Sequence, residues 1–268
     1  MNPPKPGELY QEGKLTDAVK AAREEVKQQP TDTDRRWLLC ELLCFAGELA
    51  RAEGHLDTLA RQDPKLMFSI TMFRNLIRAE KARRQFYAEG KSPEIFGEST
   101  PSLRLHLDAA GAVREERLSD AFKTLTTAEE QRVHTSGVCD GETFDDLRDA
   151  DDLTASVFEA FTVAGKYCWI PIEQVSSVEF KEIKQSVDLL WREVHLVMSN
   201  GFDGQVYLPV LYHATKDTDD DQLRWGRGTD WLGDDTSPVR GIGQRVFVVG
   251  DQGRPILELN SMKFEQTG

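Results

Sequence analysis

Apolar residues recur with a helical period through the first quarter of the chain. The first stripe contains Leu15, Ala18, Val19, Ala22 and Val26. This spacing places the apolar side chains on one face of an amphipathic helix. A second stripe follows between residues 49 and 59, and the segment between the two, residues 37–46, is apolar almost all round. We therefore expect helices that stack, with the middle one buried on both sides.

Small and helix-breaking residues repeat in the same region with a fixed displacement. Two matching triplets occur 34 positions apart: Gly13, Ala18 and Pro30, then Gly47, Ala52 and Pro64. This is the period of the tetratricopeptide repeat, in which glycine lies at a turn, alanine allows close packing and proline ends the second helix. The sequence therefore predicts a tetratricopeptide-like helical array.

A long helix is expected to follow the array, from about Met67 to Ala88. It carries a basic cluster formed by Arg74, Arg78, Lys81, Arg83 and Arg84. We favour a solvated face for this cluster, and the alternative is that it docks an acidic partner or the chain's own acidic segment. A further amphipathic helical pair is expected over residues 101–134.

The pattern changes after about residue 137 to short runs separated by turn residues. Residues 157–163 and 167–170 flank Ala-Gly-Lys and predict a hairpin, as do residues 245–249 and 255–259 around Gly-Asp-Gln-Gly-Arg. The spacing of apolar residues over residues 187–198 fits either a helix or a strand. The turn that follows this segment favours a strand for its latter part.

The whole chain is accordingly expected to be α+β. We predict a tetratricopeptide-like helical domain over residues 1–136 and a mostly antiparallel α+β domain over residues 137–268.

Composition narrows the classes of function. The 268 residues carry a net charge of −13, which argues against a protein whose main role is to bind DNA or RNA phosphates. The four cysteines and five histidines show no metal-ligand spacing. No apolar run is long enough to span a bilayer and the first residues lack a signal-peptide pattern. We expect a soluble cytoplasmic protein with reduced thiols, no cofactor, no metal and no membrane association.

Two acidic stretches resemble cation sites without having their spacing. Residues 140–152 do not place acids at the positions that an EF-hand loop requires, so we expect a solvated linker. Residues 217–221 are expected to be a flexible acidic loop. The glycines of residues 241–245 precede a strand and are expected to form a tight structural turn, not a phosphate loop.

The most distinctive polar cluster lies at residues 223–232. Asp230 has the chemistry of a general base, yet no partner stands at a recognisable spacing. We favour an Arg–Asp pair that orders this loop, with Trp225 or Trp231 as a core or interface anchor. A hydrolase that uses Asp230 with Arg227 or Arg245 is the less favoured alternative.

The ordered motifs resemble those of the ImpE/TagJ (SciE-type) family of accessory proteins of the bacterial type VI secretion system. The segments that carry the resemblance are residues 9–18, 141–152, 167–171, 190–192, 208–212, 226–231 and 239–245. The resemblance covers nearly the whole chain. It implies a tetratricopeptide-like front, an α+β back and no catalytic activity.

The resemblance also implies a partner, the small subunit of the contractile sheath, bound through its N-terminal helix near the ClpV-type ATPase that recycles the sheath. Physically this is an amphipathic helix held in an apolar groove. A general tetratricopeptide adaptor for other peptides is the alternative. The residues expected to contact the partner are Trp169, Trp191, Trp225, Arg227, Asp230, Trp231, Arg240 and Arg245.

Overall fold

Helices form the first half of the molecule. The structure, a computed structural model, describes residues 5–265. The array consists of α1 (Pro6–Gln11), α2 (Leu15–Gln28), α3 (Thr33–Phe45), α4 (Leu49–Gln62) and α5 (Met67–Glu89), with the 3₁₀ turn η1 (Pro64–Leu66) before α5. Gly13 and Gly47 lie in left-handed turns, at φ +74° and +75°, a conformation that glycine adopts at low cost. The predicted repeat and the long helix after it are confirmed.

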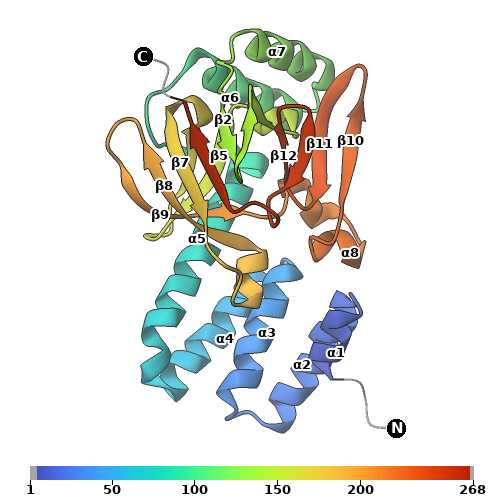
Figure 1. Ribbon diagram of the computed structural model, residues 1–268. Helices are drawn as coiled ribbons and strands as arrows, with labels where there is room; N and C mark the ends of the chain where they lie inside the picture. The colour runs from blue at the N-terminus through green and yellow to red at the C-terminus, as the bar shows by residue number, and fades with distance from the viewer. Residues whose placement is uncertain (1–4, 266–268) are drawn as a thin grey trace.

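A second helical pair leads from the array to the strands. It consists of α6 (Pro101–Arg114) and α7 (Leu118–Glu130), preceded by the short strand β1 (Glu94–Ile95). Thr100 caps α6 by accepting a hydrogen bond from the backbone of Leu103. Figure 1 shows α5 rising from the array to the sheet, with α6 and α7 at the far end of the molecule.

The strands of the back half form one large sheet. Besides β1 it contains β2 (Gly137–Cys139), β3 (Glu142–Phe144), β5 (Val157–Thr162), β6 (Tyr167–Pro171), β7 (Val175–Phe180), β8 (Trp191–Met198), β9 (Asp203–Pro209) and β14 (Ser261–Phe264). The order is β1-β6-β5-β9-β8-β7-β14-β2-β3. All neighbours are antiparallel apart from the parallel pair β1 and β6. The α+β class is thus confirmed.

Two smaller sheets and several short turns complete the fold. The strands are β4 (Leu147–Asp149), β12 (Val246–Val249) and β13 (Gln252–Pro255) in one sheet, and β10 (Thr229–Asp234) and β11 (Ser237–Gly243) in the other. The turns are η2 (Asp152–Thr154), η3 (Ile172–Gln174), η4 (Ser186–Leu189), η5 (His213–Asp217) and the short helix α8 (Asp221–Arg224).

The large sheet is buried on both faces, which explains the nearly continuous apolar runs of β5 and β6. On one face, Phe161 and Trp169 join the core formed by the helices. On the other face, Phe158 and Ile170 join a second core with Phe247 of β12. Side chains alternate between faces along a strand, so a strand covered on both sides has few polar positions.

Three local expectations are corrected by the structure. The acidic residues 140–152 are not a solvated linker, because they form β3, β4 and the start of η2, with Asp149 fully buried. The second hairpin turns at residues 250–251, so β13 begins at Gln252, earlier than expected. Residues 217–221 are not a simple loop, since Asp220 caps α8.

The glycine segment at residues 241–245 also differs from the expected tight turn. Gly241 and Gly243 are the last part of strand β11. A Cβ at Gly241 would lie 2.1 Å from the ring of Tyr212, which is closer than any side chain can approach. The glycine therefore serves the close packing of β11 on Tyr212.

The change from helices to strands falls between α7 and β2. We keep the division into residues 1–136 and 137–268 as a proposal. Within residues 5–265, no helix is both long and apolar enough to cross a membrane.

Candidate functional site

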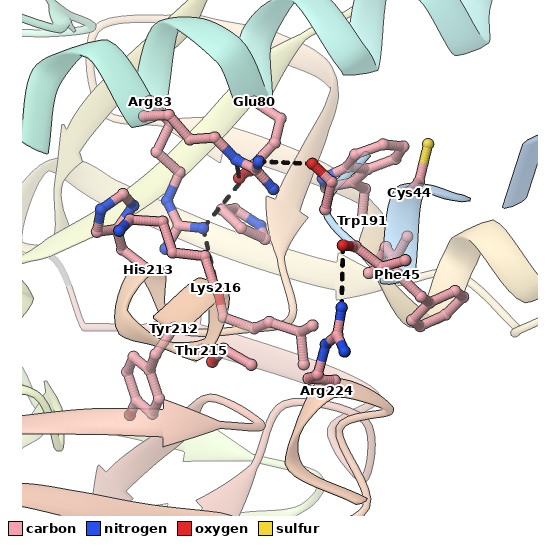
Figure 2. Close-up of a pocket in the computed structure, with 16 residues that line it drawn as sticks. Cys44, Phe45, Glu80, Arg83, Trp191, Tyr212, His213, Thr215, Lys216 and Arg224 are labelled. Carbon is pink, nitrogen blue, oxygen red and sulfur yellow. Dashed lines mark hydrogen bonds and ion pairs between the residues drawn. The ribbon is translucent and has the colours of Figure 1, made fainter. Parts of the chain in front are cut away.

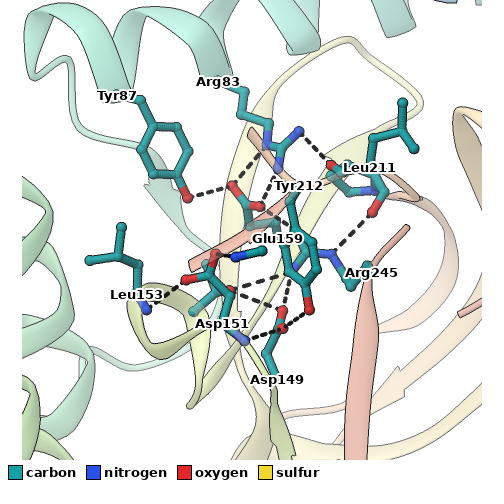
Figure 3. A network of polar contacts seen from close by, with 12 residues as sticks. Arg83, Tyr87, Asp149, Asp151, Leu153, Glu159, Leu211, Tyr212 and Arg245 are labelled. Carbon is teal, nitrogen blue, oxygen red and sulfur yellow. Dashed lines mark hydrogen bonds and ion pairs between the residues drawn. The ribbon is translucent and has the colours of Figure 1, made fainter. Parts of the chain in front are cut away.

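A buried ionic network joins α5 to the sheet (Figure 3). Arg83 of α5 donates to Glu159 of β5 through Nε at 2.9 Å and Nη2 at 2.7 Å. Arg245, which precedes β12, bonds to the same carboxylate and to Asp149 of β4. All four side chains are at most 3% exposed. The network therefore links the helices, the large sheet and the three-stranded sheet through charges that water does not screen.

Hydroxyl groups complete the bonding of these carboxylates. Tyr87 donates to Glu159 at 3.1 Å, and Tyr212 donates to Asp149 at 2.8 Å. Burial by itself raises the pKa of Glu159, but the charges of Arg83 and Arg245 outweigh burial and hold that pKa well below its usual value. Glu159 is therefore ionised and fully paired.

The network corrects the interpretation of the basic cluster on α5 as a solvated face. Arg83 is buried, and Arg84 bonds to Glu80 at 3.1 Å and to the carbonyl of Gly47 at 3.0 Å. Arg74 and Lys81 pair with acids of α4. Four of the five cations thus pair with acids of this same chain, as the alternative stated, and none of these acids comes from the acidic stretch 140–152. Arg78 is exposed, as the favoured interpretation predicted.

A small cavity lies between the helical array and the back half (Figure 2). Its volume is about 60 Å³, and Phe45, Arg83, Trp191 and His213 are among the residues that line it. The ring of His213 stacks on Tyr87 at a centroid distance of 4.1 Å. Burial and then the charge of Arg83 lower the pKa of His213, so this histidine is neutral at pH 7. The volume suits only a few water molecules.

The segment around α8 clamps the back half onto the array. Arg224 donates to the carbonyl of Ala46 at 2.9 Å, and Arg227 donates to the carbonyl of Gln11 at 3.0 Å. Trp225 packs between two aromatic rings, with centroid distances of 4.7 Å to Tyr10 and 4.5 Å to Phe45. Trp225 is thus a core anchor. Arg227 is hydrogen-bonded to α1 and does not form the expected pair with Asp230.

The residues expected to contact a partner divide into two groups. Trp169, Trp191, Trp225 and Arg245 are at most 3% exposed and stabilise the interior. Trp169 lies against Phe86 at a centroid distance of 5.2 Å, for example. Arg227, Asp230 and Trp231 are exposed, and Arg240 is half-buried. The structure therefore brings only the second group to the surface.

The exposed group lies on or near the hairpin of β10 and β11. Trp231, Leu232 and Val239 are 40%, 38% and 37% exposed, and we call these three residues the hairpin patch. Trp231 pairs with Gly241 and Leu232 with Arg240 across the two strands. In the described part of the chain β10 pairs with β11 alone, so its other edge is open. Open strand edges and exposed apolar residues are features of protein interfaces.

The geometry does not assemble the alternative hydrolase site. The carboxylate of Asp230 accepts a hydrogen bond from the backbone of Trp231 at 2.8 Å. Among residues 5–265 no ion pair joins Asp230 to Arg227 or Arg245, and Arg245 is committed to the buried network. Nor does any group of three or more metal-ligating side chains occur in this part of the chain.

Sequence reasoning missed the acidic half of the network. One signal was available, since Glu159 interrupts the apolar run of β5, Val-Phe-Glu-Ala-Phe. An acid in a strand that is buried on both faces needs a buried cation. The position of Arg83, 76 residues away, follows only from the packing of α5 on β5.

The chain is similar to known proteins over almost its whole length. The family described as ImpE protein matches residues 141–263, and a tetratricopeptide repeat family matches residues 9–68. Over 260 residues the chain is 30% identical to the type VI secretion system accessory component TagJ of Pseudomonas aeruginosa, covering 97% of this chain and 91% of the relative. A crystal structure of a Vibrio parahaemolyticus protein matches with a TM-score of 0.90 at 25% identity, over 97% of both chains.

Proposed function

The chain belongs to the ImpE/TagJ family of type VI secretion accessory proteins, and from this membership we propose that it is a non-enzymatic adaptor for the small subunit of the contractile sheath. The observation that carries the proposal is the nearly full-length similarity to the accessory component TagJ. The adaptor acts in the cytoplasm, binds the N-terminal helix of the subunit and thereby modulates how the ClpV-type ATPase handles the sheath.

The covered surface of the array favours a docking site on the back half. The turn η4 contributes Val187 and Leu189 to the core of the helices, and α8 holds Ala46 at the end of α3. These segments of the chain itself occupy the side of α3 that faces the sheet. Trp231 and Val239 of the hairpin patch fall on one face of the hairpin and Leu232 on the other, because side chains alternate along a strand. An amphipathic helix laid on Trp231 and Val239 would bury its apolar face there.

Fluorescence anisotropy with a labelled peptide that copies the N-terminal helix of the cognate sheath subunit tests the proposal. We expect saturable binding with a Kd below about 10 μM, which corresponds to about −7 kcal/mol. Trp231→Ala should weaken binding at least about tenfold, as tryptophan anchors at interfaces do. Phe68→Ala is the matched control, since Phe68 is 79% exposed and lies on α5, away from the hairpin.

The possible outcomes distinguish a wrong partner from a wrong binding surface. If neither the peptide nor the intact sheath subunit binds, the adaptor proposal is wrong. If the peptide binds equally to Trp231→Ala and the unaltered protein, the partner is right and the hairpin patch is not its site.

A general tetratricopeptide adaptor is the second candidate, favoured by the repeat match over residues 9–68. An unbiased pulldown from the native organism distinguishes the two candidates. Recovery of proteins unrelated to the sheath, with no sheath subunit among them, would favour the general adaptor.

A further inference from the structure

A second pocket opens beside the buried network. Its volume is about 220 Å³, smaller than the roughly 300–1,000 Å³ of sites for drug-sized ligands. Its walls come from α5, α6, η2, η5 and β11, with Tyr87, Val113, Leu153, His213 and Arg240 among the lining residues. Together with Glu159 of β5, these elements from both halves of the molecule converge on a space that fits one small group.

The two arginines of this pocket have no acidic partner among the described residues. In the part of the chain that the structure describes, neither Arg114 nor Arg240 forms an ion pair. Arg114 makes one long contact, 3.5 Å to the carbonyl of Phe86 at the end of α5. Lys216, the third cation, pairs with the exposed Asp217. Two unpaired guanidinium groups facing one pocket are unexpected in a chain with a net charge of −13.

The acids of the pocket, in contrast, already have their partners. Glu159 receives hydrogen bonds from Arg83, Arg245 and two tyrosines. Asp151 accepts from the backbone N–H groups of Leu153 at 2.8 Å and Gly241 at 2.9 Å. The unsatisfied charge at this site is therefore positive, which favours an anion over a cation as ligand.

Two buried nitrogen atoms in the pocket walls are also without partners. Nε of Arg240 and Nδ1 of His213 are shielded from solvent and make no hydrogen bond with any described residue. An unmet buried donor costs about 1–3 kcal/mol, and buried polar groups are nearly always paired in native proteins. An acceptor oxygen from a ligand would satisfy Nε of Arg240, and it would satisfy Nδ1 of His213 in the tautomer that carries the proton on that nitrogen.

Apolar side chains form the rest of the wall. Ala110, Val113, Leu153 and Ala214 line the pocket and would contact a short hydrocarbon group. From this combination we propose that the pocket binds a carboxylate carried on a small apolar body, with Arg240 and Arg114 holding the carboxylate. A free short-chain carboxylic acid and the C-terminal residue of a peptide share this chemistry. The proposal does not depend on sheath binding.

The experiment uses the full chain and two matched pairs of probes. Butyrate is compared with butyramide, and a pentapeptide ending in a free C-terminal valine is compared with its amidated form, by saturation-transfer NMR and thermal shift. We expect the two carboxylates to bind with a Kd of about 1 mM or tighter, and the neutral amides to bind at least about tenfold more weakly. If the peptide binds at least about tenfold more tightly than butyrate, the natural ligand is the C-terminus of a peptide. If the two affinities are equal, the natural ligand is a free acid.

Variants test the assignment of the arginines. Arg240→Gln and Arg114→Gln should each weaken carboxylate binding at least about tenfold, while Arg104→Gln, an exposed arginine of α6 outside the pocket, should leave it unchanged. Circular dichroism confirms that each variant is folded. Equal binding of acids and amides, unchanged affinity in both pocket variants, or no binding of any carboxylate at about 20 mM, well above the expected Kd, would each overturn the proposal.

Discussion

At the scale of single residues, the most unusual feature is a pair of neighbouring buried acids. Asp149 is fully buried and bonded to Arg245. Asp151 lies two residues further on, and its hydrogen-bond partners among residues 5–265 are backbone N–H groups. Burial, and then the negative charge of Asp149, raises the pKa of Asp151 to about 7. Asp151 therefore carries its proton in the folded protein under mildly acidic conditions, where a solvated aspartate is ionised.

This raised pKa predicts a loss of stability as the pH rises. Between about pH 4 and pH 7 the unfolded chain releases the Asp151 proton while the folded chain keeps it, so the free energy of unfolding falls across this window and levels off above it. Asp151→Asn removes this contribution. We expect urea denaturation at several pH values to show a flatter decline for Asp151→Asn than for the unaltered protein.

The control for this comparison is Asp235→Asn, which alters an exposed aspartate of the β10–β11 turn. Its pH profile should parallel that of the unaltered protein. Parallel profiles for all three proteins would show that Asp151 does not titrate in this window.

At the scale of elements, Glu159 connects parts of the chain that no local signal relates. Its carboxylate holds Arg83 from α5 and Arg245 from the segment before β12. It also accepts from Tyr87 of α5 and from Tyr167 of β6. One acid thus fixes the position of the long helix on the sheet. The desolvation of these charges is costly, so the pairing specifies the packing more than it adds net stability.

Removing this single negative charge should be strongly destabilising. Glu159→Gln leaves two buried guanidinium groups near each other without their shared counter-charge, and breaking such a pair costs about 3–5 kcal/mol. Equilibrium unfolding in urea measures the change. Arg117→Gln, which removes an exposed cation that pairs with Glu115 and Asp120, should leave the stability nearly unchanged, because solvent screens exposed ion pairs. Similar losses for the two variants would contradict the role given to Glu159.

At the scale of the whole molecule, the two halves are held together at separate points. The buried network joins α5 to the sheet, and the segment around α8 joins the back half to α1, α2 and α3. Besides the aromatic packing of Trp225, the backbone of Thr16 donates to Asp221 at 3.1 Å. The proposed domains 1–136 and 137–268 therefore share a core, since Phe161 and Trp169 of the sheet belong to the same apolar cluster as the helices.

Trp225 should dominate the second attachment. Trp225→Ala removes a side chain that is 3% exposed and leaves a cavity between Tyr10 and Phe45, which should cost about 3–5 kcal/mol of unfolding free energy. Trp231→Ala, six residues away and 40% exposed, is the matched control and should cost less than about 1 kcal/mol. Chemical denaturation followed by circular dichroism compares the two. A loss for Trp225→Ala no greater than that for Trp231→Ala would show that this attachment does not stabilise the fold.

Features that depend on local pattern could be predicted from the order of residues alone. Helical periodicity and the recurrence of Gly13, Ala18 and Pro30 predicted the array, because each helix needs one apolar face and each turn needs a particular residue. Turn residues located the hairpin of β5 and β6. The order of motifs identified the family, which the full-length similarity then confirmed.

Which polar residues are buried and which aromatic residues are accessible became clear from the packing of distant segments. Trp169 and Trp231 look alike in the sequence, yet one is fully buried and the other is 40% exposed. Arg83 looks like one more solvated charge of its helix until the packing of α5 on β5 brings it into contact with Glu159. The physical reason is that burial and charge pairing depend on segments far apart in the chain, whereas periodicity and turn chemistry act between near neighbours.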